Sequence, residues 1–224
     1  MEAEGSSSEG IPDITDTQYT EFREKVMGEI YGEDLIIDNK IVSSSDFMKG
    51  WQIGDFKKEN PEHVDMMNKL FERAKPFSEI FDKTSHIYLY RGVSSYGRVR
   101  GDSVLTGIYD TTPFGKLLRE RELPASFENK SYTSWSTNKN YASGYVSKYT
   151  KKRNSEKCCL LRLKLSIDTP VLPVEKVLDD PGYPDAEDEY EVILPPGKLN
   201  ITGREIGEYK GQFGITTIID VELN

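Results

Sequence analysis

The stretch HIYLYRGV, His86 to Val93, marks the point where this sequence changes from helical to strand-like composition. It is rich in Tyr, Ile and Leu, and it predicts a strand from His86 to Arg91. The chain before it is typical of helices, and most of the chain after it is typical of strands. This order predicts an α+β domain, because an α/β fold would alternate the two regularly.

Upstream of this strand, the sequence predicts two helices. In the first, apolar residues recur at three- and four-residue spacing, at Tyr19, Phe22, Val26 and Ile30. Thr15 or Asp16 is its expected N-cap, and Gly32 follows its end. A second helical block is expected from Pro61 to Lys83, with an interruption at Pro76. We expect these helices to serve as scaffold.

Downstream, the sequence predicts mostly strands and two helical segments. A short helix is expected around Phe114 to Arg121, and a longer one in TNKNYASGYVSKYTKK, residues 137–152, with Asn138 near its start. Strands are predicted in SYTSWS (131–136), KCCLLRLKLSI (157–167), DEYEVILP (188–195), KLNITGREI (198–206) and GITTIIDVEL (214–223).

The 224 residues suit one compact domain. Residues 1–12 are small, polar and acidic, and we expect a mobile tail. The domain would run from 13 to 224, mainly helical over 13–84 and mainly β over 85–224. The charge is −9, from 38 acidic and 29 basic residues, which disfavours general nucleic-acid binding.

The few cysteines and histidines limit the chemistry further. Cys158 and Cys159 are adjacent, so they predict no disulfide framework. His63 and His86 belong to no ligand-spaced cluster, so we expect no metal. No signal peptide or membrane span is evident, and we expect a cytoplasmic protein without membrane contact.

Three separated fragments matter together: YRG (Tyr90–Gly92), YTSWS (Tyr132–Ser136) and EYE (Glu189–Glu191). Each alone is typical of a surface ion pair, an edge strand or a solvated strand face. In this order, they resemble the arginine, serine, glutamate class of mono-ADP-ribosyltransferases. From Tyr88 onward the sequence is most similar to the enzymes of T4-type bacteriophages, Alt and Mod, although a bacterial effector of the class would look similar.

This resemblance implies N-terminal helices packed on a split β-sheet core. It also implies that NAD is the substrate, that ADP-ribose passes to an arginine of a target protein, and that nicotinamide is released. The target would be a host protein with an accessible arginine, and the enzyme a monomer. A planar guanidinium suits the diphosphate of NAD.

The resemblance assigns roles to the first two fragments. Arg91 matches the arginine that binds the dinucleotide in this class. Gly92 has no side chain, so the backbone there could come close to the amide group of nicotinamide. Ser134 and Ser136 match the outer serines of a Ser-Thr-Ser motif, and the first is expected to hydrogen-bond the catalytic glutamate. Trp135 replaces the middle threonine and, by strand alternation, should pack in the core.

In the third fragment, Glu191 matches the glutamate that stabilises the oxocarbenium-like transition state. Glu189 matches the position associated with arginine acceptors, where a carboxylate orients the guanidinium and assists proton removal. Strand alternation would put these two glutamates on one face, and Tyr190 between them should pack on the other.

Further contacts are expected from two other segments. Tyr145 occupies the place of an aromatic residue that stacks on nicotinamide, and Lys148 that of a basic residue near phosphate. For each residue a structural role is an equal alternative: Tyr145 could belong to the hydrophobic core, and Lys148 could be an ordinary exposed lysine. The loop from Leu178 to Asp188, with Tyr183, is the candidate for target recognition; its alternative is a plain exposed connection.

Other functions stay open beside the transferase. In an NAD glycohydrolase water would replace the arginine acceptor, and a noncatalytic interaction domain would keep the fold alone. A glycosidase is disfavoured, because carboxylates two residues apart on one strand lie on the same side of a substrate.

Overall fold

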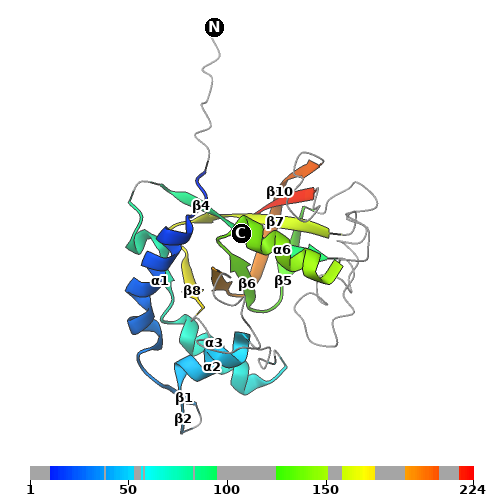
Figure 1. Ribbon diagram of the computed structural model, residues 1–224. Coiled ribbons are helices and arrows are strands. Elements are labelled where there is room, and N and C mark those ends of the chain that lie inside the picture. The colour runs from blue at the N-terminus through cyan, green and yellow to red at the C-terminus, as the bar shows by residue number, and fades with distance from the viewer. Residues whose placement is uncertain are drawn as a thin grey trace.

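The computed structural model describes residues 11–37, 39–52, 57, 59–82, 84–94, 125–150, 158–174, 190–206 and 217–224. It confirms the α+β fold (Figure 1). The helices are α1 (Asp16–Tyr31), α2 (Ser44–Gln52), α3 (Pro61–Phe71), the short 3-10 helix η1 (Phe77–Glu79) and α6 (Lys139–Thr150).

The strands lie in a two-stranded hairpin and one nine-stranded sheet. The hairpin pairs β1 (Leu35–Ile37) with β2 (Lys40–Val42). The large sheet has the order β3-β8-β9-β6-β4-β7-β11-β10-β5. Its strands are β3 (Lys75–Pro76), β4 (His86–Ser94), β5 (Ser126–Asn129), β6 (Thr133–Ser136), β7 (Cys158–Ser166), β8 (Pro170–Pro173), β9 (Glu191–Leu194), β10 (Gly197–Ile206) and β11 (Thr217–Leu223).

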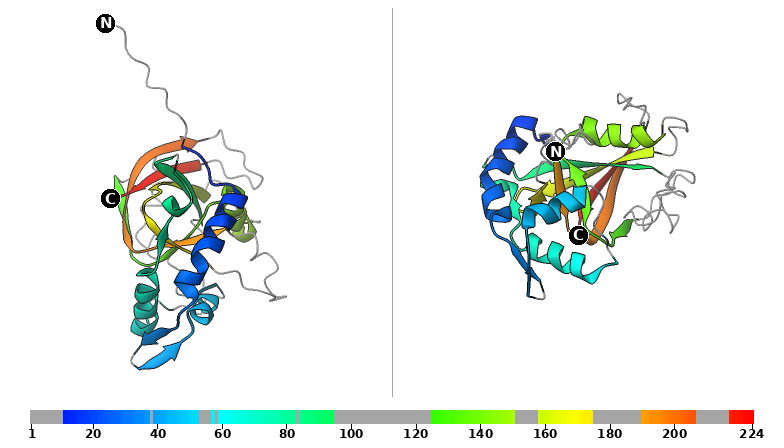
Figure 2. Two further views of the ribbon diagram at one scale, coloured as in Figure 1. Left: turned by 90° about the vertical axis from the view of Figure 1, so that its left-hand side faces the viewer. Right: turned by 60° about the horizontal axis from the view of Figure 1, so that its bottom comes forward.

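The large sheet is divided between β6 and β4. In the described residues these strands share a single register pair, Tyr90 with Ser136. By contrast, β4 pairs with β7 along its whole length, from His86 opposite Ser166 to Ser94 opposite Cys158. Figure 2 shows the strands curving around the core, with α1, α2 and α3 together at one side. The nine strands thus form two parts that meet along one weak seam.

Helix α1 begins and ends where the sequence predicts. Thr15, not Asp16, is the N-cap: its side chain accepts from the backbone N–H of Gln18, and Gln18 bonds back to the Thr15 N–H at 2.9 Å. This reciprocal capping box satisfies two donors that a helix end otherwise leaves unpaired. Gly32 follows the last turn, and the predicted face, Tyr19, Phe22, Val26 and Ile30, is buried.

The second helix is shorter in the structure than the predicted block from Pro61 to Lys83. Helix α3 ends at Phe71, and the chain then extends so that Lys75 pairs with Val171 of β8. Pro76 lacks an N–H donor, and β3 is an edge strand, where proline is tolerated. The hairpin β1–β2 and helix α2 lie in a stretch for which no element was predicted. The short helix expected at 114–121 lies outside the described residues.

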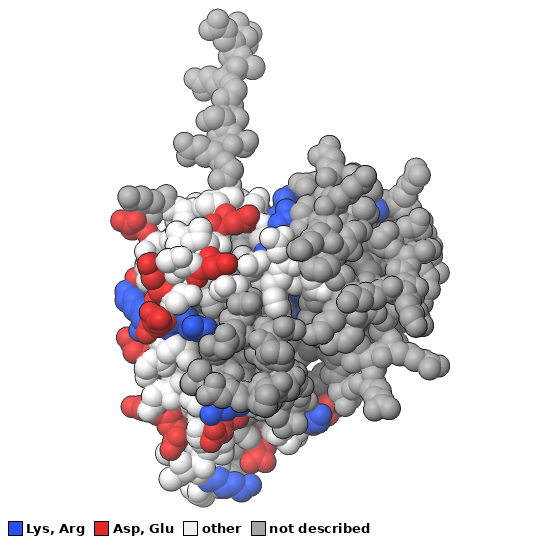
Figure 3. Space-filling model, viewed as in Figure 1, with Lys and Arg blue, Asp and Glu red and all other residues white. Residues whose placement is uncertain are grey.

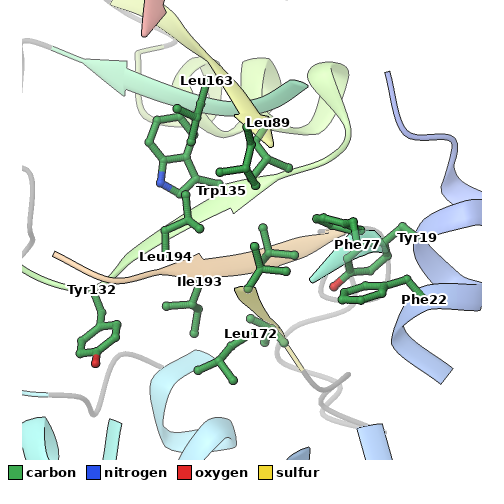
Figure 4. Packing of buried hydrophobic residues seen from close by; sticks show 14 of the residues in the cluster. Tyr19, Phe22, Phe77, Leu89, Tyr132, Trp135, Leu163, Leu172, Ile193 and Leu194 are labelled. Atoms are coloured by element: carbon green, nitrogen blue, oxygen red, sulfur yellow. The ribbon is translucent and has the colours of Figure 1, made fainter. Parts of the chain in front are cut away.

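The main hydrophobic core lies between the helices and one face of the sheet. Figure 4 shows side chains of α1 and η1, such as Phe22 and Phe77, on the same side as Leu172 of β8 and Ile193 of β9. In the same view, Trp135 of β6 lies among leucines of the neighbouring strands. Phe22 and Phe77 are fully buried, with ring centroids 4.4 Å apart. A smaller cluster, formed by Tyr90, Ala142, Leu160 and Ile218, packs α6 on the sheet.

Candidate active site

The strand order brings the three motif fragments onto neighbouring strands. Arg91 lies on β4, Ser134 and Ser136 lie on β6, and Glu191 begins β9; these strands are adjacent in the order β9-β6-β4. Ser136 lies opposite Glu191 on one side and opposite Tyr90, the residue before Arg91, on the other. The fragments therefore converge at the seam of the sheet.

Arg91 connects the two parts of the sheet. Its side chain is half-buried, and Nη1 donates a hydrogen bond of 2.9 Å to the backbone oxygen of Ser134. This bond places the guanidinium at the junction of β4 and β6. Gly92 follows on β4, opposite Leu160 of β7.

The two serines differ in their surroundings. Ser136 is buried, and its Oγ accepts from the backbone N–H of Asn138 at 3.0 Å. Asn138 in turn caps α6, because its Oδ1 accepts from the N–H groups of Asn140 and Tyr141, both at 3.0 Å. Ser136 therefore shapes the turn that leads from β6 into α6, and Asn138 lies at the helix start as predicted.

Ser134 lies two register pairs away from the position opposite Glu191. We expected its hydroxyl to bond the glutamate, but within the part of the chain that the structure describes no hydrogen bond joins the two. The register gives the reason: Ser134 lies opposite Ile193, and Ser136 is the residue opposite Glu191.

Glu191 accepts hydrogen bonds at its backbone oxygen and at its carboxylate. Its backbone oxygen accepts from the hydroxyl of Tyr19 at 2.5 Å and from the N–H of Val174 at 3.0 Å. Its carboxylate Oε1 accepts from the indole Nε1 of Trp51 at 3.4 Å. Tyr19 belongs to α1 and Trp51 to α2. Helix α1, which we expected to be scaffold, and helix α2, which the sequence did not predict, thus both contact the predicted catalytic glutamate.

Tyr190 has an unusual backbone immediately before this strand. Its φ is 45°, in the left-handed region that bulky residues rarely occupy. Its carbonyl accepts from the Thr137 N–H at 3.0 Å, and its ring meets Tyr19 edge-on at 5.8 Å between centroids. Tyr190 packs against the core as expected. Strand β9 begins at Glu191, directly after Tyr190.

Trp135 packs in the core as predicted. Its side chain is 3% exposed, and its Nε1 donates to Thr133 Oγ1 at 3.0 Å. Figure 4 shows the indole close to Leu89, Leu163 and Leu194. The replacement of a threonine by tryptophan in the middle of the motif therefore adds to the core of the domain.

Several predicted residues lie beyond the part of the chain that the structure describes. Glu189 and Tyr183 are among them, as is the loop from Leu178 to Asp188. Tyr145 and Lys148 belong to α6, but their side chains are likewise outside the description. Among the described side chains, no group of His, Cys, Asp or Glu is arranged to hold a metal ion. None of the described helices is long and apolar enough to cross a membrane.

Figure 3 shows acidic side chains spread over the described part of one face, with Lys and Arg among them. A hollow of about 390 Å³ lies elsewhere, and its lining includes Asp13, Glu21 and Asp82 together with Ile14, Phe81 and Ile87. Three carboxylates would repel a diphosphate. None of the motif residues that the structure describes lines this hollow.

Comparison with known proteins identifies the fold. No protein-family model matches the sequence. No curated protein matches it either. Among solved structures, a C3-type ADP-ribosyltransferase from Clostridium botulinum is similar at a TM-score of 0.54 and 14% identity, over 96% of this chain and 98% of that one. A C3-type protein from S. aureus, solved with NAD, gives 0.54 and 13% over 96% and 98%. The chain therefore has the fold of the C3 ADP-ribosyltransferases, and its resemblance to phage enzymes rests on the sequence motifs alone.

Proposed function

We propose that the protein is a mono-ADP-ribosyltransferase that uses NAD and transfers ADP-ribose to an arginine of a target protein. The observation that carries this proposal is the meeting of Arg91, Ser136 and Glu191 on three adjacent strands. Residues that are 45 and 55 positions apart in the sequence come together at the seam of this fold. The site residues, their roles and the acceptor are our assignment.

Glu191 would act on the bond between ribose and nicotinamide. As this bond breaks, nicotinamide leaves with the bonding electron pair, and positive charge develops on the ribose. A carboxylate beside the ribose stabilises that charge more in the transition state than in the substrate. The bonds from Tyr19 and Val174 to its carbonyl oxygen fix the backbone of Glu191 before substrate binds. Such preorganisation is what electrostatic catalysis requires.

Arg91 would bind the diphosphate of NAD. The guanidinium carries five N–H donors in a planar fork, and an anionic oxygen accepts such bonds more strongly than a neutral one. The bond to the Ser134 carbonyl orients the fork at the seam without neutralising its charge. Gly92, the next residue, leaves the backbone beside the site accessible to the amide of nicotinamide.

Glu189 is the basis for proposing arginine as the acceptor of ADP-ribose. A nitrogen of the target guanidinium would attack the anomeric carbon as nicotinamide leaves, with inversion, and the proton lost from that nitrogen would pass to the Glu189 carboxylate. The new bond joins the guanidinium nitrogen to the ribose. We propose a cytoplasmic host protein as target, with the loop that contains Tyr183 in its recognition. Stacking by Tyr145 and phosphate binding by Lys148 belong to the same proposal.

The experiment is incubation of the protein and NAD with a bacterial lysate, followed by mass spectrometry for ADP-ribosylated peptides. We expect modified arginines with wild type and none with Glu191→Gln. Glu128→Gln is the matched control, because Glu128 is exposed on β5. Modification of residues other than arginine would overturn the acceptor assignment, and equal labelling by Glu191→Gln would overturn the site.

A further inference from the structure

The side chains of Trp51, in the last turn of α2, and Glu191, at the start of β9, are in contact. Nε1 of Trp51 donates to Oε1 of Glu191 at 3.4 Å, across 140 positions of sequence. We infer that Trp51 is a positioning residue, whose indole N–H holds the Glu191 carboxylate in the orientation that NAD cleavage requires. This inference rests on the proposed function for its kinetic consequence, whereas the contact itself can be tested separately.

Helix α2 is anchored firmly enough to fix Trp51. Met48, one turn before Trp51, is fully buried in the main core, and Trp51 packs against the same core. At the helix start, the Ser44 hydroxyl donates to the carbonyl of Glu33 at 2.5 Å. Arg73 donates to the Glu33 carbonyl at 2.7 Å and to Ser44 Oγ at 3.3 Å. The position of the indole is therefore set by helix packing and by polar contacts at the other end of the helix.

The backbone of Glu191 is fixed independently of Trp51. Tyr19 and Val174 both donate to its carbonyl oxygen, from α1 and from the end of β8. These two bonds place the backbone of Glu191 and do not involve its carboxylate. A donor on the carboxylate itself selects among these rotamers. Trp51 supplies such a donor, and it lies on α2, outside both the serine motif and the glutamate motif.

The chemistry of indole suits this task. Its N–H is a donor only and offers no lone pair, so it favours a carboxylate in the ionised form. The ring brings this donor on a rigid, largely apolar body. Because a hydrogen bond to a charged acceptor is stronger than one between neutral groups, its loss should lower kcat by about tenfold.

The kinetic test compares Trp51→Phe with Trp135→Phe. The chain has two tryptophans, and the second donates to Thr133 in the core, away from Glu191. Each variant keeps an aromatic ring and removes one indole N–H. For nicotinamide release, Trp51→Phe should lower kcat about tenfold and leave KM for NAD within about twofold. Trp135→Phe should lower the melting temperature but leave kcat within about twofold. An unchanged kcat in Trp51→Phe, or an equal loss in both variants, would overturn the inference.

A spectroscopic test does not depend on turnover. Two tryptophans give two indole N–H signals in a ¹H–¹⁵N correlation spectrum, assigned by loss of one signal in each Phe variant. Glu191→Gln, which removes the charge but keeps the shape, should shift the Trp51 signal and leave the Trp135 signal in place. Glu128→Gln should shift neither. An unmoved Trp51 signal would overturn the inference even if wild type releases nicotinamide. A shifted signal in a protein without turnover would overturn the proposed function but retain the contact.

Discussion

Ser136 lies directly opposite Glu191 in the antiparallel register of β6 and β9. Side chains that face each other across an antiparallel pair lie on the same face of the sheet. A slip of one residue would turn every side chain of one strand to the other face. The register of two four-residue strands thus determines whether the serine and glutamate motifs can act together.

Replacement of Arg91 by lysine should weaken NAD binding. Lysine keeps the charge but loses the planar fork and cannot reproduce both the bond to the Ser134 carbonyl and paired bonds to phosphate. We expect Kd for NAD to rise at least about tenfold, which corresponds to roughly 1.4 kcal/mol. The measurement is the NAD-dependent rise in melting temperature.

Arg162→Lys is the control for this change. Arg162 forms a two-bond pair with Asp220, with Nε to Oδ1 at 2.5 Å and Nη2 to Oδ2 at 3.0 Å. Its replacement should lower the melting temperature and keep the response to NAD. If both lysine variants lose the response equally, Arg91 has no special part in binding.

Glu189→Gln should separate protein modification from NAD cleavage. The amide cannot accept the proton of the attacking guanidinium, whereas cleavage depends on Glu191. Labelling of target arginines should fall at least about a hundredfold while nicotinamide release persists. A parallel loss of both activities would place Glu189 in the cleavage step, and retention of both would remove it from acceptor chemistry.

Phe22→Ala should destabilise the domain by about 3–5 kcal/mol, because it opens a cavity beside Phe77 in a fully buried aromatic pair. Ile41→Ala is the control, because Ile41 is 74% exposed on the hairpin; its effect should stay within about 0.5 kcal/mol. Urea unfolding measures both. A difference of less than about 1 kcal/mol between the variants would contradict the core assignment.

Stability should fall at alkaline pH through two tyrosines. Burial, aided by the hydrogen bond to Asp13, raises the pKa of Tyr90, and burial also raises the pKa of Tyr132. A raised folded pKa means that the stabilisation is complete below the unfolded pKa of about 10 and declines as pH rises above it. Urea unfolding between about pH 8 and 11 should show this decline, less steeply in Tyr132→Phe. Equal slopes in wild type and variant would contradict the contribution of Tyr132.

The sequence predicted those elements whose signals are local. The capping box and the apolar spacing of α1 lie within a single helix. Asn138, which caps α6, is likewise next to the helix whose start it predicts. The strands β5 and β8 have four residues each and lack a distinct period, so they escaped prediction. Helix α2, with nine residues, also escaped prediction.

The site was predictable only in part, because its contacts are distant in sequence. The ordered fragments predicted a site that contains Arg91, Ser134, Ser136 and Glu191, and the strands that carry these residues are adjacent in the sheet. No local pattern relates Trp51 to Glu191, since only packing of α2 brings them together. Strand alternation also predicted a shared face for Glu189 and Glu191, and this stays a prediction because Glu189 lies outside the described residues. A tryptophan in an amphipathic stretch was the one available signal, and it is equally typical of a core residue.

The most direct test of the central claim is the rate of nicotinamide release from NAD by wild type, Glu191→Gln and Glu128→Gln. Binding of NAD, followed by its melting-temperature shift, serves as the check on folding. We predict release by wild type and Glu128→Gln, and a loss of at least about a thousandfold in Glu191→Gln with NAD binding retained. Release by Glu191→Gln at the wild-type rate would contradict the account.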